Sequence, residues 1–437
     1  MTRKLITSLL AVGLCLALTG CGMMEKIFPV KKAEIEVQNK EKYEIVKTEK
    51  YKIAAIELTA DVNTKKTYER QPDEAFKKAY QEFAVNMFKE TVSREQNSLI
   101  SPYSMIMALA MTANGANADT LSEMENVLGG GMSIDSLNEY LYCLQKTSNK
   151  DSGFKSAQSL WIKKNSVKVN DSFLENVKSC YDSQVYEAAF DSNTVSDINN
   201  WVNRSTDGMI KELIKEIGTD SFMYIINALC FEKKWDAPYM DYQVKKDKFT
   251  SIDGKSQDVN MMNSTEYHYI EGDGVKGFKK PYEADENGKR YNFVALLPDD
   301  FDEFVDNLTA DKLTELLTNN IHTTVYAGLP KFSYDYSLSV KQSLINMGME
   351  NAFLPSADFS KMSDEKEIFI GDVIHKTYID VSESGTKAAA VTAVEMDCGS
   401  SMPEEPKEVY LNKPFIYMIV DSQTNIPIFM GAVVEIK

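Results

Sequence analysis

The sequence predicts an α+β fold with large mixed or antiparallel sheets. Apolar residues recur at helical spacing mainly in the earlier part of the chain, and strand-like apolar runs lie mainly in the later part. The two last runs, 415–420 and 426–434, flank a polar segment whose composition is typical of a hairpin turn. Helices followed by strands, rather than a regular alternation of the two, favour α+β over a parallel α/β fold.

The individual elements follow from these periods. The clearest helix is 72–92, where Phe76, Tyr80, Phe83 and Met87 share one face. Further helices are predicted at 104–113, 120–128, 198–204, 213–216 and 337–347. Besides the closing hairpin, strands are predicted at 156–162, 223–231, 291–297, 323–329, 367–370 and 376–381.

The N-terminus has the pattern of a bacterial lipoprotein signal. Two basic residues precede an apolar run, 5–18, that is too short to span a bilayer. Residues 18–21 (LTGC) then resemble a lipobox, with cleavage after Gly20 and a diacylglycerol on Cys21. We expect residues 1–20 to be a signal peptide, and the mature protein to be secreted and lipid-anchored at the outer face of a bacterial cell membrane. An ordinary signal peptide with an incidental cysteine is the alternative.

The rest of the chain divides by composition. Residues 21–70 are rich in Lys and Glu, and we expect them to be mostly a charged tether behind the lipidated cysteine. An apolar patch within 51–58 leaves a strand open as the alternative there. No repeat and no Pro/Gly-rich linker interrupts residues 71–437, which predicts one large domain or two intimately packed ones.

Charge and cysteine content exclude several classes of function. A formal net charge of −17 argues against a nucleic-acid partner, because phosphate binding requires clustered Lys and Arg. Beyond the signal and the lipid site, the cysteines are Cys143, Cys180, Cys230 and Cys398, without Cys-x-x-Cys spacing. We expect the first three to be buried thiols, and we expect no metal and no cofactor.

Common enzyme motifs are missing from the sequence. Only three histidines occur, and there is no His-Glu-x-x-His, Gly-x-Ser-x-Gly or phosphate-binding loop. Residues 272–277 match a dinucleotide fingerprint, but that fingerprint must open a helix, whereas Pro281 and the aromatic alternation around it indicate a strand. We therefore expect a turn between two strands, and a protein that is not an enzyme. A hydrolase built on scattered carboxylates is the least favoured alternative.

A series of short motifs spans the chain from about residue 76 to its end. They are NSLISPYS (97–104), INNWV (198–202), TDGMI (206–210), INALCF (226–231) with Trp235, LPKF (329–332), MGM (347–349), ADFS (357–360), VIHK (373–376), NKPF (412–415) and FMG (429–431). Each is weak alone, but in this order they resemble the serpin family, and so many motifs over most of the chain are specific.

The resemblance implies a serpin fold with three β-sheets, about eight or nine helices and an exposed reactive loop near the C-terminus, about 383–408. It also implies that a target protease cleaves this loop. Before the acyl-enzyme hydrolyses, the loop inserts as a strand into the main sheet and distorts the trapped protease. We therefore expect a monomeric inhibitor of serine or cysteine proteases. A non-inhibitory serpin-fold surface binding protein is the alternative.

Residues 383–392 resemble the serpin hinge, which enters the sheet first. The implied hinge residues are Glu383, Gly385, Thr386, Ala388, Ala389, Ala390 and Thr392. Side chains of an inserted strand alternate between core and surface. Uncharged residues occupy positions 386, 388, 390, 392, 394 and 396, whereas Lys387, Glu395 and Asp397 have the other parity. The family usually has Glu where Lys387 stands, and we expect this side chain to face solvent and matter little. An Ala-rich helical linker is the alternative.

A polar cluster is implied beneath the main sheet, where strands separate to admit the loop. Its residues would be Ser101, Ser104, Asn227 and His375. Such side chains can break and remake hydrogen bonds as the strands part, which predicts a gate that we call the shutter. The alternative is a cluster that only satisfies buried backbone groups. Trp235 is expected to pack near the entry point of the loop, or simply in the core.

Two counts place the bond that the protease would cleave. The family spacing, roughly 16 or 17 residues beyond Glu383, gives Cys398-Gly399 or Gly399-Ser400. Counting back from Pro414 gives Met402-Pro403, so the candidates are Cys398, Gly399, Ser400, Ser401 and Met402. No Lys or Arg lies between positions 387 and 407, which favours elastase-like or subtilisin-like targets over trypsin-like ones, with papain-like proteases second.

Overall fold

The computed structural model describes residues 53–63, 66–147, 153–218, 221–365, 368–386 and 405–436. Contacts divide the chain into two units, Met1–Lys52 and Ile53–Lys437, and all described residues belong to the second unit. The signal, the lipobox with Cys21, and residues 387–404 with the candidate reactive bonds lie outside the described residues. The same holds for the hinge residues from Ala388 onward.

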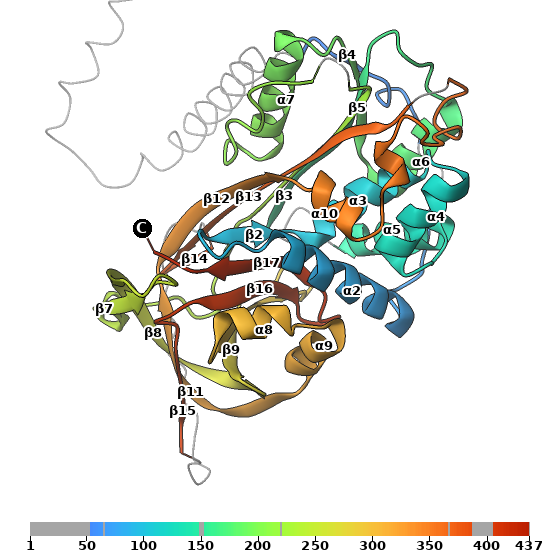
Figure 1. Cartoon of the computed structure of the whole chain (residues 1–437). Coiled ribbons are helices and arrows are strands. Elements are labelled where there is room, and N and C mark those ends of the chain that lie inside the picture. The colour runs from blue at the N-terminus through green and yellow to red at the C-terminus, as the bar shows by residue number, and fades with distance from the viewer. Residues whose placement is uncertain are drawn as a thin grey trace, which may run out of the picture. The chain divides into compact units, whose positions relative to one another are not determined.

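Nine α-helices occur within the described residues (Figure 1). They are α2 Glu74–Thr91, α3 Pro102–Ala113, α4 Ala118–Gly129, α5 Ile134–Thr147, α6 Asp171–Tyr181, α7 Ser192–Ser205, α8 Phe301–Asp306, α9 Ala310–Thr318 and α10 Lys341–Asn346. Two 3₁₀ turns, η2 Asp241–Gln243 and η3 Asn351–Phe353, accompany them. The sequence predicted α2, α3, α4 and α7 but missed α5, α6, α8 and α9. In this part of the chain no helix combines the length and the hydropathy needed to cross a membrane.

Two helix predictions were wrong in whole or in part. Residues 213–216 form a loop, because the Asn199 side chain accepts the backbone N–H groups of Leu213 (2.8 Å) and Ile214 (3.1 Å) and donates to the Ile214 carbonyl. These bonds replace the intrahelical ones. The predicted helix 337–347 is instead the end of a strand followed by the short α10.

The first sheet is the main sheet of the molecule and has eight strands in the described residues. Its path is β1 Ile56–Glu57, β4 Gln184–Ala188, β3 Phe154–Lys163, β5 Met223–Phe231, β13 Ile370–Ser382, β14 Gly385–Thr386 and β6 Lys233–Lys234, and β12 Phe332–Ser339 also pairs with β13. The strand predictions at 156–162, 223–231 and 376–381 lie within this sheet. The neighbours β5 and β13 run parallel.

The second sheet has nine strands in the part of the chain that the structure describes, and it includes the closing hairpin, as predicted. Its path is β15 Lys407–Tyr410, β11 Asn320–Pro330, β8 Ser256–Gly272, β9 Val275–Pro281, β10 Tyr291–Pro298, β16 Phe415–Asp421, β17 Pro427–Val433 and β2 Ser98–Ile100, and β7 Val244–Thr250 pairs with β8. The predicted α+β class is confirmed. The described strands form two hydrogen-bonded sheets rather than the expected three. The reason is the 17-residue β8, which pairs with β7, β9 and β11 and so joins these strands into one sheet.

The core fills the space between the two sheets and continues on the far face of the main sheet. Helix α3 contacts β3 and β5 of the main sheet and β17 of the second sheet, and it is buried along its whole length. Strand β5 is buried on both faces: Ile225 and Leu229 belong to the larger core, whereas Ile226 and Cys230 belong to a smaller core beneath α7. Such a strand reads as one continuous apolar run, which is why it was predicted well.

The folded unit begins before residue 71, so the predicted tether does not extend to residue 70. Strand β1 pairs antiparallel with β4, the strand that the sequence left open as an alternative. The Asp197 carboxylate accepts the backbone N–H groups of Ala54 and Ala55 (3.0 and 2.8 Å). A carboxylate on α7 thus fixes the backbone that leads into β1.

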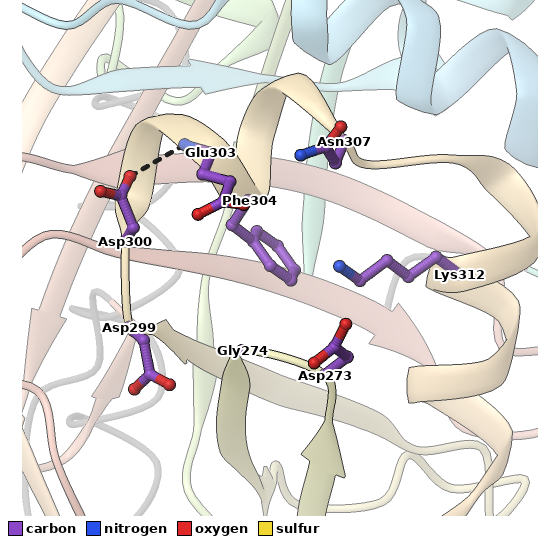
Figure 2. Close-up of a pocket in the computed structure, with 8 residues that line it drawn as sticks. All are labelled: Asp273, Gly274, Asp299, Asp300, Glu303, Phe304, Asn307 and Lys312. Carbon is purple, nitrogen blue, oxygen red and sulfur yellow. Dashed lines mark hydrogen bonds between the residues drawn. The ribbon is translucent and has the colours of Figure 1, made fainter.

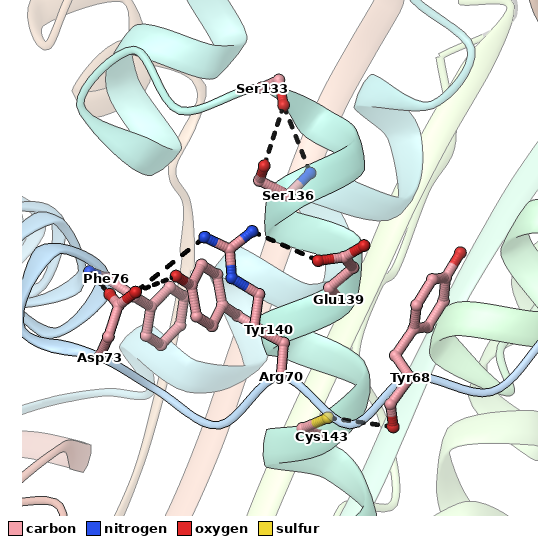
Figure 3. A network of polar contacts seen from close by, with 9 residues as sticks. All are labelled: Tyr68, Arg70, Asp73, Phe76, Ser133, Ser136, Glu139, Tyr140 and Cys143. Atoms are coloured by element: carbon pink, nitrogen blue, oxygen red, sulfur yellow. Dashed lines mark hydrogen bonds and ion pairs between the residues drawn. The ribbon is translucent and has the colours of Figure 1, made fainter.

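A second set of contacts holds the segment before α2 against α5 (Figure 3). Arg70 pairs with Glu139 at 3.3 Å and its guanidinium lies 4.2 Å from the centre of the Tyr140 ring. Asp73, the N-cap of α2, accepts the Phe76 N–H and also binds the Tyr140 hydroxyl. These contacts make residues 66–73 part of the folded unit.

Candidate functional site: the main sheet and the loop hinge

The four predicted shutter residues lie together, although they are far apart in the sequence. Ser101 caps α3 and its hydroxyl also donates to the Ile428 carbonyl at 2.8 Å. The Ser104 hydroxyl donates to Asn227 Oδ1 at 2.7 Å, and the Asn227 amide donates back to the Ser104 carbonyl. All four side chains, including His375, are fully buried. The contact is therefore observed, while the role as a gate stays a prediction.

His375 is the centre of this cluster. Its Nε2 accepts the Ser101 backbone N–H at 3.0 Å, so the proton of the neutral ring is on Nδ1, which donates to Asn227 Oδ1 at 2.7 Å. Burial lowers the pKa of His375 from 6.5 to about 3. The ring is thus a neutral connection between the start of α3 and the two central strands.

The place where a loop strand would enter is closed. Strands β5 and β13 are direct neighbours, paired in parallel from Met223 and Ile370 to Cys230 and Tyr378. The shutter bond between Asn227 and His375 lies within this ladder, because these two residues are register partners. Insertion of a strand at this position must therefore break that bond.

Part of the hinge already forms a short strand, which lies beside the C-terminal end of β13. Gly385 and Thr386 form β14, which lies between β13 and β6. Gly385 has φ +147°, and a Cβ there would lie 2.2 Å from the Lys233 carbonyl oxygen, so only glycine fits. Two of the hinge residues, Gly385 and Thr386, thus occupy places in the main sheet, with strand partners on both sides.

Thr386 has the orientation that the parity argument requires. Its side chain is 0% exposed, and its hydroxyl shares a 2.7 Å hydrogen bond with the Tyr282 hydroxyl. Its strand partner Val381 is buried as well, and along β13 buried residues alternate with partly exposed ones. The position at 386 therefore faces the core, while the later positions of the pattern lie outside the described residues.

Two aromatic residues bind the backbone carbonyls of residues 382–384, where β13 leads into the hinge. Trp235 donates its indole N–H to the Ser382 carbonyl (2.9 Å) and its backbone N–H to the Ser384 carbonyl (3.1 Å). Tyr239 donates its backbone N–H to the Glu383 carbonyl at 2.9 Å. Trp235 is fully buried and stacks on Tyr282 at 4.4 Å between ring centres. Trp235 is therefore part of the core and also binds the backbone of residues 382–384, so the alternative that it lies simply in the core is too narrow.

The Glu383 side chain binds Lys331 at 2.7 Å. Partial burial alone would raise the pKa of Glu383, but the hydrogen bond and the charge of Lys331 outweigh it and lower the pKa. Lys331, Tyr239 and Tyr282 were not among the predicted site residues. Lys331 belongs to the LPKF motif and could have been found there, whereas nothing local in the sequence connects Tyr282 with Thr386.

The glycine-rich segment 272–277 is a turn between strands β8 and β9, as predicted. It borders a cavity of about 400 Å³ next to α8 and α9 (Figure 2). The cavity is lined by Asp273, Gly274, Asp299, Asp300, Glu303, Phe304, Asn307 and Lys312. Four carboxylates around one lysine repel phosphate groups, which excludes a dinucleotide at this place.

The structure bears on the cysteine and metal expectations only within the described residues. Cys143, Cys180 and Cys230 are buried thiols, as predicted. Within the described ranges no group of three or more His, Cys, Asp or Glu residues is arranged to hold a metal ion. Cys398 lies outside these ranges.

Comparisons with known proteins agree with this geometry. A family model described as "Serpin (serine protease inhibitor)" matches residues 78–436. An uncharacterised serpin-like protein of Thermococcus kodakarensis is 31% identical over 370 residues, covering 82% of this chain and 85% of the relative. Human Serpin B3 is 29% identical over 379 residues, covering 80% and 96%.

Solved structures of the thermophilic serpin tengpin also match. Its native state is 41% identical with a TM-score of 0.83 and covers 88% of this chain and 100% of tengpin. The latent state of tengpin is 39% identical with a TM-score of 0.74, and the match covers 85% of this chain and 100% of tengpin. The fold and the matched family model define a protein of the protease-inhibitor type in general, and the chain belongs to the serpin family.

The buried imidazole predicts a specific pH dependence. The pKa of His375 is about 3 in the folded protein, whereas an exposed histidine has a pKa of 6.5. Between about pH 3 and pH 6.5 the unfolded chain therefore binds a proton that the folded chain does not. The free energy of unfolding should therefore fall as the pH drops below 6.5, by about 1.4 kcal/mol per pH unit. In urea unfolding, His375→Gln should lose about 2 kcal/mol less than the wild type between pH 7.5 and 5. Equal losses in both proteins would contradict this assignment.

Proposed function

We propose that this serpin inhibits proteases by cleavage of its reactive loop, trapping of the acyl-enzyme and insertion of the loop between β5 and β13. The observation that carries the proposal is the position of β14. The hinge has two residues in the main sheet, bonded on one side to β13 and on the other to the strand that follows β5. From this start the rest of the loop has a defined path.

The register of β14 gives that path. Thr386 is opposite Val381 and Lys233. Counting forward along the loop and backward along both neighbours, residue 392 would come between His375 and Asn227. His375 and Asn227 are already register partners, so β13 and β5 could separate around the inserted strand without shifting along one another. Thr392 would replace the shutter bond with hydroxyl contacts, which supports the shutter as a gate.

The same count gives Lys387 a role that its parity alone did not suggest. It would lie between Asp380 and Glu232 on the solvent face of the sheet. The family usually has a glutamate at this hinge position, which would there meet two carboxylates. A lysine instead offers opposite charge to both neighbours, and cross-strand pairs of opposite charge favour strand pairing.

The state of the structure supports an insertion that has yet to occur. Strands β5 and β13 pair directly, and the match to native tengpin is better than the match to latent tengpin. A non-inhibitory serpin is the second candidate, and human thyroxine-binding globulin, 22% identical, has the same fold. The small residues at 388–392 favour insertion, because bulky or charged side chains there would hinder entry into the core.

We also propose that the protein acts at a membrane surface. The support is the LTGC segment at the end of the apolar signal run, from which Cys21 would receive its lipid. An anchored inhibitor would protect the outer face of the cell against proteases that reach it.

The first prediction compares one arginine at two neighbouring hinge positions. Thr386→Arg forces a guanidinium into a position that is 0% exposed, which costs several kcal/mol when the charge is unpaired. We expect this variant to be cleaved as a substrate without forming a stable complex. Lys387→Arg is the matched control, since it places the same side chain on the opposite face and should trap protease normally. Normal stoichiometry of trapping by Thr386→Arg would refute the parity argument.

The second prediction concerns the reactive bond and the class of protease that cleaves it. Elastase-like or subtilisin-like proteases should form a denaturant-resistant complex of combined mass on a gel, and papain-like proteases are second choice. Trypsin should not, because the window 397–402 offers no cation to its pocket. Mass spectrometry of the released fragment should place its first residue within 398–403. Stoichiometric trapping of trypsin, or a fragment that starts elsewhere, would overturn the assignment; cleavage without a complex by every protease would favour the non-inhibitory alternative.

The third prediction concerns the anchor. Cys21→Ala removes the acceptor of the lipid, so the protein should leave the membrane fraction or remain unprocessed. Cys15→Ala, within the apolar run of the signal, is the control and should leave membrane association intact. The measurement is a fractionation of cells followed by detection of the protein, and unchanged association of Cys21→Ala contradicts the lipobox.

A further inference from the structure

A buried ion pair lies directly behind the residues that bind the hinge. Lys280 on β9 is 2% exposed and Glu266 on β8 is 5% exposed, and the two are joined at 2.9 Å. Glu266 also accepts the Ser264 hydroxyl at 2.7 Å. Two charged side chains are thus withdrawn from water within the hydrophobic interior between the sheets.

The Lys280 ammonium faces two aromatic rings. It lies 4.4 Å from the centre of the Tyr239 ring and 5.5 Å from the centre of the Trp235 ring. Attraction between a cation and the face of an aromatic ring is strongest where water is excluded, as it is here. The lysine therefore fixes the positions of both rings relative to β9.

Those two aromatic residues, together with Tyr282, form what we call the hinge shelf. Trp235 and Tyr239 hold the carbonyls of residues 382–384, and Tyr282 holds the Thr386 hydroxyl. Tyr282 also stacks on Trp235 and follows β9 directly in the chain. The ammonium, the shelf and the hinge are therefore three layers in direct contact.

Stability alone is a weak reason for this ion pair. Removing two charges from water costs free energy that their attraction repays only partly, and apolar replacements of buried pairs are often neutral or stabilising. An apolar residue would fill the place of Lys280 but would not orient two rings. The geometry thus favours a role in positioning over a role in stability.

We propose that Lys280, held by Glu266, is a positioning residue that keeps the hinge shelf in place and thereby keeps Gly385 and Thr386 paired in the main sheet. The preformed strand β14 is the start from which insertion proceeds. Without the cation the shelf loosens, the start of insertion is lost more often, and the trapped protease escapes by hydrolysis more often. This consequence rests on the proposed inhibitory function, whereas the positioning of the hinge does not.

The test uses the full-length protein with the double substitution Lys280→Met and Glu266→Gln, which removes both charges with little change in volume. Lys279→Met is the matched control. Lys279 is the neighbouring residue, is also buried at 7% exposure, and donates at 2.6 Å to the Leu317 carbonyl, away from the shelf. Hydrogen exchange followed by mass spectrometry reports on the hinge without any protease. We expect amide exchange in the peptide containing residues 382–386 to be at least tenfold faster in the double variant and within twofold of wild type in Lys279→Met.

Unchanged hinge exchange in a folded double variant would overturn the proposal, and so would faster exchange spread evenly over the molecule. If the double variant does not fold, Glu266→Gln alone decides, with an expected acceleration of at least threefold confined to the hinge. A second readout is the number of inhibitor molecules consumed per trapped protease, which should at least double. Failure of the wild type to trap any protease would refute the proposed function and leave the exchange result to decide on Lys280.

Discussion

The direct pairing of β5 with β13 is the constraint on which the rest of this molecule depends. The two central strands of the main sheet are joined edge to edge, although Gly385 and Thr386 of the hinge already pair with the last two residues of β13, beyond the end of β5. The sheet therefore has an unfinished strand and a closed path in front of it. The bond between His375 and Asn227 lies across the paired strands, and Trp235, Tyr239 and Tyr282 bind residues 382–386.

Each part of this arrangement is fixed by groups that have few alternative partners. Neutral His375 accepts one backbone N–H and donates to one amide oxygen, so it satisfies both ring nitrogens only while the strands are together. The backbone at Gly385 has room for no side chain. Carbonyls 382–384 each bind a donor from Trp235 or Tyr239. Within the described residues, these bonds together favour one conformation of the segment 382–386.

The sequence was most informative where a pattern is local. Strand β5 and the closing hairpin are continuous apolar runs, and α2 has a clear helical period, so their existence follows from nearest neighbours. The loop at 213–216 was wrongly predicted as a helix. Its backbone groups bind the side chain of Asn199, which lies on another segment, α7, and these bonds take the place of intrahelical ones. The shutter was predicted from a family resemblance and not from spacing: Ser101 and His375 are 274 residues apart.

The candidate site was predicted less completely than the fold, for physical reasons. A lysine and a glutamate within strand patterns indicate solvent-facing positions, and nothing local in the sequence reveals that Lys280 and Glu266 pair in the interior. Likewise, the contact between Tyr282 and Thr386 exists only because the chain returns after 104 residues. The reactive bond and the lipid site rest on motifs and counting, and they stay predictions.

The burial of β5 on both faces determines how the sheet can part. Its even-numbered and odd-numbered side chains sit in different hydrophobic layers, so movement out of the plane would pull one whole layer into water. A sideways slide within the plane would keep both layers covered and would break the backbone hydrogen bonds between β5 and β13 together with the bond between Asn227 and His375. An inserting strand could replace the lost backbone hydrogen bonds one residue pair at a time, starting from the end where β14 already pairs with β13.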